Sequence, residues 1–161
     1  MKILRLCARL PPLPGGMENH ISQLSKEQNK IGRNVTIYFN AGDKLSHNDI
    51  RVTKLPLYKS KPRFIGIIVF YLFVYLRLLV KKEKFDVVHF HGDWSSLVFA
   101  SLIKKTVGGK KIIITIHDEL SENIWSRRAL SLMLNQVDII FSTGYSSADQ
   151  ISNLTSKKVM I

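Results

Sequence analysis

Histidines follow two apolar segments of the sequence, where they could bind polar ligands. His91 and Asp93 lie at the end of a short apolar run that also contains His89, and His117 directly follows the β-branched run 110–116. His89 and His91 are two residues apart, so in a strand both side chains point to the same face. Imidazole groups so placed can bind substrates, transfer protons or bind a metal ion. The plainer interpretation places one histidine in the core and the other at the rim of the sheet.

A metal site would need further ligands beside this pair. The spacing His89-x-His91-x-Asp93 is similar to the opening motif of metallo-β-lactamase-like hydrolases, which continues with a histidine where this sequence has Trp94. The order of predicted elements also differs from the antiparallel sandwich of those enzymes. We therefore expect no metal site, and a metallohydrolase remains a remote alternative.

Two adjacent glycines, Gly15 and Gly16, separate the first apolar run from the first amphipathic segment. Glycine lets the backbone pass close to a ligand, and the free N–H groups at a helix start favour phosphate. The pair is not part of a G-x-G-x-x-G fingerprint, and no Gly-Lys-Ser/Thr follows, so neither a dinucleotide site nor a P-loop is indicated. A phosphate site and a tight turn without a ligand both fit this pair.

Alternating strands and helices are expected to position these residues. Runs rich in β-branched and aromatic residues predict strands at 1–8, 33–39, 50–55, 86–91, 110–116 and 137–141, with a further apolar run from 158. Helical spacing of apolar residues predicts helices at 17–31, 64–80, 94–105, 125–135 and 146–154. This alternation predicts an α/β fold with a Rossmann-like, doubly wound, mainly parallel sheet in one domain, 1–161. Ligands bind outside the carboxyl ends of such strands, where Gly15, Gly16, His91 and His117 would meet.

The composition describes a basic globular protein. The 161 residues are 45% hydrophobic, which excludes disorder over most of the chain, and carry a formal charge of +12. Nine basic residues and one acidic residue fall in 51–84, so the positive charge is local and suits an anionic partner. The single cysteine, Cys7, excludes an internal disulfide and is expected to be buried in a cytosolic protein.

The segment 64–76 is apolar on every side, so a helix there must be covered. It is shorter than the roughly 20 residues of a transmembrane helix and is followed by Arg77, which disfavours a membrane span. Such a helix can pack on the sheet or in a domain interface, or lie in a membrane interface with its basic ends on anionic headgroups. The residues expected at an anionic membrane surface are Lys59, Lys61, Arg63, Arg77, Lys81 and Lys82. No helix-turn-helix, zinc-finger or single-strand-binding pattern accompanies them, so we expect no nucleic-acid partner.

Several short segments, in their order and spacing, resemble the amino-terminal domain of retaining GT-B glycosyltransferases of family 4. They are PP at 11–12, GGME at 15–18, GRNV at 32–35, FDVVHFHG at 85–92, ITIHD at 114–118 and VDII at 137–140. In that family two Rossmann-like domains face each other across a cleft. The second binds most of the nucleotide-sugar, and the first shapes the acceptor site.

The resemblance implies roles for individual residues. Gly15 and Gly16 would give backbone N–H contacts to the donor diphosphate, and His117 would contact the donor sugar near the reacting centre as the catalytic histidine. The residues that would line the acceptor side are Glu18, His20, His91 and Asp93. No metal ion or other cofactor is implied.

The resemblance also implies what the complete enzyme does. It would transfer a sugar from a nucleotide-sugar donor to a glycan or lipid-linked acceptor, as in surface-polysaccharide assembly, with retained configuration. The paired-glutamate motif and the basic residues that clamp the diphosphate belong to a carboxyl-terminal domain that this chain lacks, so we expect the chain alone to be inactive. It would then be half of an enzyme or one subunit of a split transferase, in the cytoplasm or peripheral on the inner face of the membrane. The alternative is a non-catalytic module that binds a membrane or a partner protein.

Overall fold

A computed structural model of the chain describes residues 1–43, 50–55, 63–117, 120 and 123–161. The strands are β1 (Lys2–Leu6), β2 (Asn34–Phe39), β3 (Arg51–Lys54), β4 (Val87–His91), β5 (Lys111–Ile116), β6 (Ile139–Ser142) and β7 (Val159–Met160). The helices are α1 (Gly16–Lys30), α2 (Arg63–Lys81), α3 (Ala100–Val107), α4 (Ile124–Leu134) and α5 (Tyr145–Ser152), with a 3₁₀ turn, η1 (Trp94–Leu97). Lys59 and Lys61 lie outside the described residues, as does the side chain of Arg63.

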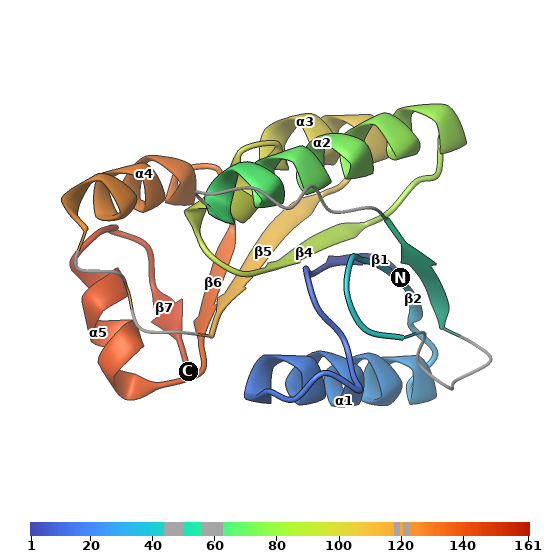
Figure 1. Cartoon of the computed structure of the whole chain (residues 1–161), viewed down its shortest axis with the longest axis horizontal. Coiled ribbons are helices and arrows are strands. Elements are labelled where there is room, and N and C mark those ends of the chain that lie inside the picture. The colour runs from blue at the N-terminus through green and yellow to red at the C-terminus, as the bar shows by residue number, and fades with distance from the viewer. Residues whose placement is uncertain (44–49, 56–62, 118–119, 121–122) are drawn as a thin grey trace.

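All seven strands form one parallel sheet in the order β3-β2-β1-β4-β5-β6-β7. Helices α2, α3 and α4 lie on one face of the sheet, and α1 and α5 lie on the other (Figure 1). The strand order reverses between β1 and β4, where Arg5 is paired in register with His89. The predicted Rossmann-like sheet is therefore confirmed, and ligands bind such sheets outside the carboxyl ends of the strands beside that reversal.

The buried apolar residues that the structure describes form two clusters, which lie mainly on opposite faces of the sheet. The larger packs α2, α3 and α4 against apolar residues of β1, β4, β5 and β6. The smaller packs Ile21 of α1 against β1 and β2 and includes Cys7, which is fully buried. Burial raises the pKa of the Cys7 thiol to about 12. The sequence prediction that Cys7 is buried is confirmed.

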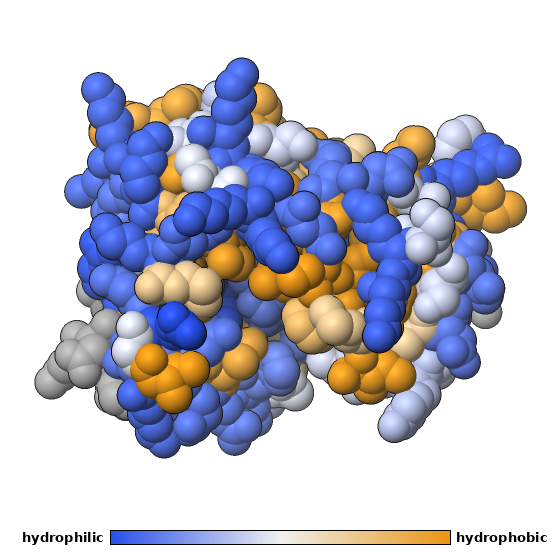
Figure 2. Space-filling view, turned by 180° about the vertical axis from the view of Figure 1, so that it is seen from behind, coloured by the Kyte–Doolittle hydropathy of each residue, from blue (hydrophilic) through white to orange (hydrophobic). Residues whose placement is uncertain are grey.

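The face on which α1 lies is open over β5 and β6. A cavity of about 560 Å³ there is lined by Leu24, Gln28, Ile113, Phe141 and other residues. Seen from behind, apolar side chains gather in the middle of the molecule between hydrophilic margins (Figure 2). Helices α1 and α5 therefore leave part of the sheet uncovered between them.

The predicted helix 94–105 is divided in the structure. It consists of η1 and α3, with Val98 and Phe99 between them. The Asp93 carboxylate accepts hydrogen bonds from the Ser95 backbone N–H at 2.9 Å and from the Ser95 hydroxyl at 2.5 Å, and the Asp93 carbonyl accepts one from the Ser96 hydroxyl at 2.6 Å. Such local bonds between side chain and backbone compete with regular helix, which explains the tight first turn.

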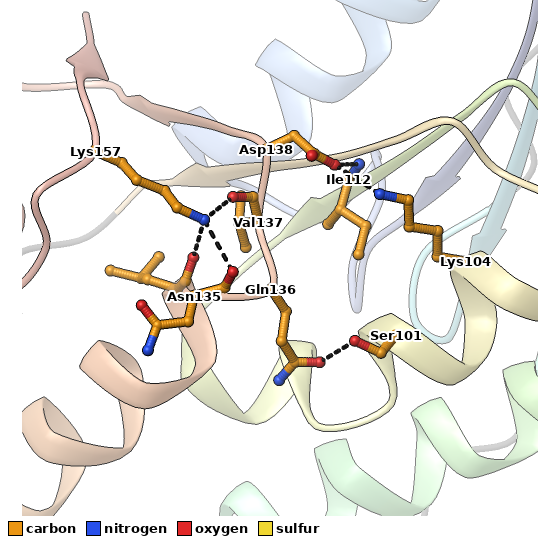
Figure 3. A network of polar contacts seen from close by, with 9 residues as sticks. Ser101, Lys104, Ile112, Asn135, Gln136, Val137, Asp138 and Lys157 are labelled. Carbon is orange, nitrogen blue, oxygen red and sulfur yellow. Dashed lines mark hydrogen bonds and ion pairs between the residues drawn. The ribbon is translucent and has the colours of Figure 1, made fainter.

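A polar network ties the amino-terminal ends of β5 and β6 to the helices (Figure 3). The Asp138 carboxylate accepts hydrogen bonds from the Ile112 N–H at 2.6 Å and from the Lys104 ammonium at 3.0 Å. The Lys157 ammonium donates to the carbonyls of Leu134 at 3.1 Å and Asn135 at 2.9 Å, which lie at the carboxyl end of α4, and to that of Val137. These contacts hold the edge of the sheet opposite the carboxyl ends of its strands.

Helix α2 is covered on one side only. Phe70, Val74 and Leu78 are fully buried against the sheet, but Leu72 and Leu76 are exposed on the other side, together with Phe73, Leu79 and Val80. The stretch Phe64–Lys81 has the length and composition to cross a membrane, and 28% of it is buried inside the structure. The helix therefore agrees with the predicted range 64–80 and continues through Arg77, beyond the apolar run 64–76. Packing against the sheet accounts for one of its faces and leaves the other apolar and exposed.

Candidate functional site

The glycine pair lies between β1 and α1, and its two members differ. Gly15 has a φ of +155°, and a Cβ atom there would lie 2.1 Å from the Glu18 Oε2 atom. A Cβ atom on Gly16, the first residue of α1, would meet nothing within 4 Å. The fold therefore requires glycine at position 15, whereas position 16 faces open space.

A cavity of about 560 Å³ adjoins this loop, and we call it the glycine cavity. It is lined by Arg9, Pro14, Gly15, Gly16, Met17, Glu18, His20, His117 and Thr143. Glu18 is 3% exposed and pairs with Arg9, whose Nε atom lies 2.9 Å from the Glu18 Oε1 atom. The first amides of α1 have no partner within the helix, so the cavity combines N–H donors and a helix dipole suited to an anion.

Four histidines from three elements gather beside the glycine cavity. His20 lies on α1, His89 and His91 on β4, and His117 directly after β5. The His91 Nδ1 and His117 Nε2 atoms are hydrogen-bonded at 3.0 Å, and the His89 Nε2 atom is bonded to the Thr115 hydroxyl at 2.8 Å. The His117 ring centroid lies 5.3 Å from that of His91 and 5.4 Å from that of His20. The strand ends thus bring the predicted His91 and His117 into direct contact.

The histidine rings on β4 are neutral at pH 7 because their surroundings disfavour the charged form. Burial is the main cause, and it holds the pKa values of His89 and His91 well below 6.5, with neighbouring histidines and the Arg5 guanidinium adding to the effect. Burial, followed by Arg5, also lowers the pKa of His20. Arg5 itself is fully buried in β1, and its guanidinium donates to the Gln28 side-chain oxygen at 2.7 Å and to the Ser25 hydroxyl. A fixed positive charge therefore lies beneath neutral imidazoles that can donate and accept hydrogen bonds.

We expect the free energy of unfolding to fall as the pH is lowered from 7 to 5. The lowered folded-state pKa values of His89 and His91 mean that the unfolded chain binds more protons below its ordinary imidazole pKa of 6.5. Each of these two histidines lowers the free energy of unfolding by up to about 1.4 kcal/mol per pH unit in that range. Asp86 and Asp138 also have lowered pKa values, but their contributions are lost only as the pH approaches their ordinary value of 3.8.

Urea unfolding at neutral and mildly acidic pH measures this loss. The variant His89→Gln keeps an amide that can reach the Thr115 hydroxyl but removes one titrating group, so it should reduce the pH dependence. Equal free energies of unfolding for the unmodified chain at the two pH values would contradict the prediction.

A second, smaller cavity of about 190 Å³ lies on the other side of His117, and we call it the tyrosine cavity. It is lined by Ala8, Met17, Phe64, Ile67, Tyr71, His91, Gly92, Asp93, Ser96, Ile116 and His117. Met17 and His117 also line the glycine cavity. His117 therefore borders two cavities, one at a helix start and one with largely apolar walls.

The structure divides the residues that were predicted for the acceptor side. Glu18 and His20 line the glycine cavity, with Gly15 and Gly16, whereas His91 and Asp93 line the tyrosine cavity. His117 is common to both groups. Among the basic residues expected at a membrane surface, Arg77, Lys81 and Lys82 are exposed at the carboxyl end of α2.

Arg9, Thr143 and Tyr71 also line the two cavities but were not predicted as site residues from the sequence. Arg9 and Thr143 follow β1 and β6, so the rule about strand ends could have found them. The Thr143 hydroxyl donates to the His117 carbonyl at 3.2 Å and so holds the backbone of the histidine. Tyr71 lies in the middle of the apolar run, where only its hydroxyl group could have indicated a place in the site. Within the described residues, no group of three or more His, Cys, Asp or Glu side chains is placed to hold a metal ion.

Comparison with known protein families shows to which family the chain belongs. The family model described as Glycosyltransferase Family 4 matches residues 14–160. The chain belongs to this family. The resemblance inferred from its short motifs is thereby confirmed.

Curated relatives of this family 4 chain include GPI3 subunits of phosphatidylinositol N-acetylglucosaminyltransferase. It is 26% identical over 145 residues to the phosphatidylinositol N-acetylglucosaminyltransferase GPI3 subunit of Saccharomyces cerevisiae, a match that covers 84% of this chain and 32% of that protein. It is 30% identical over 111 residues to the corresponding subunit of Schizosaccharomyces pombe, covering 66% of this chain and 24% of that protein. The chain thus spans about a third or less of the length of these relatives.

Solved structures show that the family 4 chain has the fold of a glycosyltransferase half. The catalytic domain of starch synthase IV from Arabidopsis thaliana, bound to ADP and acarbose, superposes with a TM-score of 0.74 at 14% identity, covering 99% of this chain and 50% of that one. An α-glucosyltransferase in complex with UDP and DNA superposes with a TM-score of 0.58 at 15% identity, covering 99% of this chain and 41% of that one. At these identities the likeness concerns the fold.

Proposed function

We propose that this chain is the acceptor-side half of a glycosyltransferase that transfers a sugar from a nucleotide-sugar to a lipid-linked or surface-glycan acceptor with retained configuration. The observation that carries the proposal is the position of His117 between the glycine cavity and the tyrosine cavity. A donor sugar held in the first and an acceptor hydroxyl held in the second would meet at this side chain. Membership of glycosyltransferase family 4 supports the same reaction class.

The glycine cavity is the donor side in this proposal. The donor diphosphate would lie over Gly15 and Gly16, where the amides at the start of α1 would stabilise the charge that develops on the leaving group. Arg9 borders this cavity while paired with Glu18, so the negative charge of Glu18 is neutralised before a diphosphate enters. His117 would hydrogen-bond the donor sugar beside the bond that breaks.

The base would bind to a second domain or to a partner subunit that faces the carboxyl edge of the sheet, which would also supply basic side chains to the diphosphate. The length of the relatives supports this arrangement, because this chain covers 32% of the yeast GPI3 subunit. Catalysis by the 161 residues alone is not expected, since a cleft between two such halves is what excludes water from the reaction.

A lipid-bearing acceptor is favoured by two observations. The yeast relative is a subunit of a phosphatidylinositol N-acetylglucosaminyltransferase. Helix α2, whose Phe64 lines the tyrosine cavity near the start of the helix, exposes an apolar face with basic residues at its end. Such a helix can lie in the interface of an anionic membrane and present the acceptor to the site, on the cytoplasmic side.

The test uses the complete protein that the gene encodes, purified with any partner subunit that it requires. It is assayed with a panel of nucleotide-sugars, a lipid extract as acceptor, and NMR of the anomeric configuration in the product. Product formation with retained configuration is the expected result. If no nucleotide-sugar binds or is consumed while the protein binds vesicles, the chain is the alternative, a membrane-binding module with the fold of a transferase half.

We expect the exposed face of α2 to bind vesicles that contain phosphatidylglycerol. Replacing Leu72 and Leu76 together by serine removes two exposed apolar side chains, and each fully inserted leucine contributes about 1.5–3 kcal/mol, so vesicle flotation should fall at least about tenfold. The matched control is Ile31→Ser, because Ile31 is 70% exposed beyond α1 on the opposite face of the sheet. Equal flotation of the double variant and the control would contradict a membrane role for α2.

A further inference from the structure

His91 and His117 share one hydrogen bond, and the position of its proton determines the state of both rings. The His91 Nδ1 and His117 Nε2 atoms lie 3.0 Å apart. A neutral imidazole has one nitrogen that donates and one that accepts, so the proton in this bond belongs to one of the two rings. The ring that donates it forces the other ring to accept at this atom and to carry its own proton on its far nitrogen.

The surroundings of His91 favour a proton on its Nδ1 atom. The residue is 2% exposed, and its Nε2 atom has no hydrogen-bond partner among the described residues. Burial holds its pKa well below 6.5, so the ring carries a single proton at pH 7. A proton on Nε2 would be a buried N–H group without an acceptor, which is rarer in native proteins than a buried acceptor without a donor. The proton therefore belongs on Nδ1, where the His117 ring accepts it.

This arrangement determines where His117 carries its own proton. A proton on the His117 Nε2 atom would place two N–H groups against each other at 3.0 Å, so that atom must accept the hydrogen bond from His91. The proton of neutral His117 then lies on Nδ1. The ring can donate a hydrogen bond from that atom alone.

Packing holds the His91 ring in place. Strand β4 lies between β1 and β5, and His91 is paired in register with Thr115 of β5. The His91 ring lies 4.2 Å from that of His89, whose Nε2 atom is bonded to the Thr115 hydroxyl at 2.8 Å. The backbone of His117 is held separately, because its carbonyl accepts from the Thr143 hydroxyl at 3.2 Å. A histidine ring that cannot turn imposes one tautomer on the ring to which it is bonded.

We propose that His91 is a positioning residue, whose Nδ1–H group fixes the neighbouring His117 ring in the tautomer that has its proton on Nδ1. This inference rests on the proposed function, in which His117 would hydrogen-bond the donor sugar. The fixed tautomer makes that contact one in which His117 donates from Nδ1 to a sugar oxygen. A histidine in the wrong tautomer cannot make the same hydrogen bond, so a residue that sets the tautomer affects the rate without touching the substrate.

The test is NMR at pH 7 of the 161-residue chain with isotope-labelled histidine, since correlations between ring protons and ring nitrogens show which nitrogen is protonated. The spectrum of His117→Gln identifies the His117 signals by their absence. The proposal expects a protonated Nδ1 atom on both His91 and His117, with a coupling across the hydrogen bond that joins them. A protonated Nε2 atom on His117 in the unmodified chain overturns it.

Replacing His91 by leucine removes the donor and keeps an apolar side chain in the core. His117 should then lose its fixed tautomer and carry its proton mainly on Nε2, which the free side chain prefers in water. If the leucine variant does not fold, His91→Gln serves instead, because its amide reaches the position of Nε2 rather than that of Nδ1. An unchanged His117 tautomer in the folded variant overturns the proposal.

The matched control is His89→Gln. His89 stacks on His91 and is bonded to Thr115, so this variant perturbs the packing of the cluster but retains the bond between His91 and His117. The His117 tautomer should stay as it is in the unmodified chain. A change of tautomer in this control as large as that in the His91 variant would show a general effect of packing and would overturn the specific role of His91.

Kinetics of the complete protein separate this inference from the proposed function. His91→Leu should lower the kcat of sugar transfer at least about tenfold and change the KM of the donor less, because the ring is present but offers the wrong nitrogen. An active protein whose kcat is unchanged by this substitution overturns the positioning role. The NMR measurement needs neither donor nor turnover, so an inactive complete protein would contradict the proposed function and leave the tautomer result standing.

Discussion

Replacing His117 by alanine is expected to lower the kcat/KM of sugar transfer by the complete protein about a hundredfold. His117 borders both cavities and is hydrogen-bonded to His91 at 3.0 Å, so its ring is held between the two cavities, where donor and acceptor would meet in the proposed reaction. Removing one hydrogen-bonding group from the place where charge develops costs about 10²–10³ in kcat, or roughly 2.7–4 kcal/mol of barrier. The effect should appear mainly in kcat, because the contact strengthens in the transition state.

The control for His117 is another histidine of the same cluster. His89→Gln preserves an amide that can reach the Thr115 hydroxyl, and His89 lines neither the glycine cavity nor the tyrosine cavity. Its activity should stay within about threefold of the unmodified protein. Thermal unfolding of both variants checks that the fold is retained. An His117→Ala enzyme with unchanged kcat/KM would remove His117 from the reaction.

Replacing Gly15 by alanine is the second change with a large expected effect. The added Cβ atom would lie 2.1 Å from the Glu18 Oε2 atom, and a φ of +155° is unfavourable for any residue with a Cβ. Glu18 must move, which breaks its pair with Arg9 at the wall of the glycine cavity. Backbone strain of this kind costs about 1–3 kcal/mol. We expect a lower free energy of unfolding and a loss of donor binding, measured by urea unfolding and by calorimetry with the donor.

Gly16→Ala separates stability from binding. A Cβ atom there meets nothing within 4 Å, and alanine is a better helix residue than glycine, so the free energy of unfolding should change by less than about 0.5 kcal/mol. If the donor diphosphate lies over this loop, the methyl group should still weaken donor binding. Equal stability of the two alanine variants would contradict the packing of Gly15, and unchanged donor binding by Gly16→Ala would contradict a diphosphate over the loop.

The arrangement of the site could be predicted from the sequence as far as strand ends determine it. The β-branched run 110–116 and the buried run 86–91 identify two central strands, and parallel strands bring their carboxyl ends to one edge. His91 and His117 are therefore neighbours for a reason that is visible in the sequence. The same reasoning explains why the predicted order of strands and helices agrees with the structure.

Contacts between side chains from distant elements could not be predicted in this way. Nothing local indicates that Glu18 turns back to Arg9, or that it and His20 line one cavity while His91 lines another. The sequence also could not predict which face of α2 is exposed, because an apolar run has no polar side to show which face packs on the sheet. Tyr71 is an example, because the sequence alone does not show that its side chain lines a cavity.

Because Cys7 is buried, we expect that thiol reagents do not modify the folded protein. Thiols react as thiolates, and the only cysteine of the chain is fully buried with a pKa raised to about 12. Maleimide dyes and spin labels should therefore leave the native protein unmodified without any cysteine having to be removed. A single substitution such as Leu76→Cys would then carry the sole probe, and its fluorescence or spin relaxation would report how deeply α2 enters a bilayer.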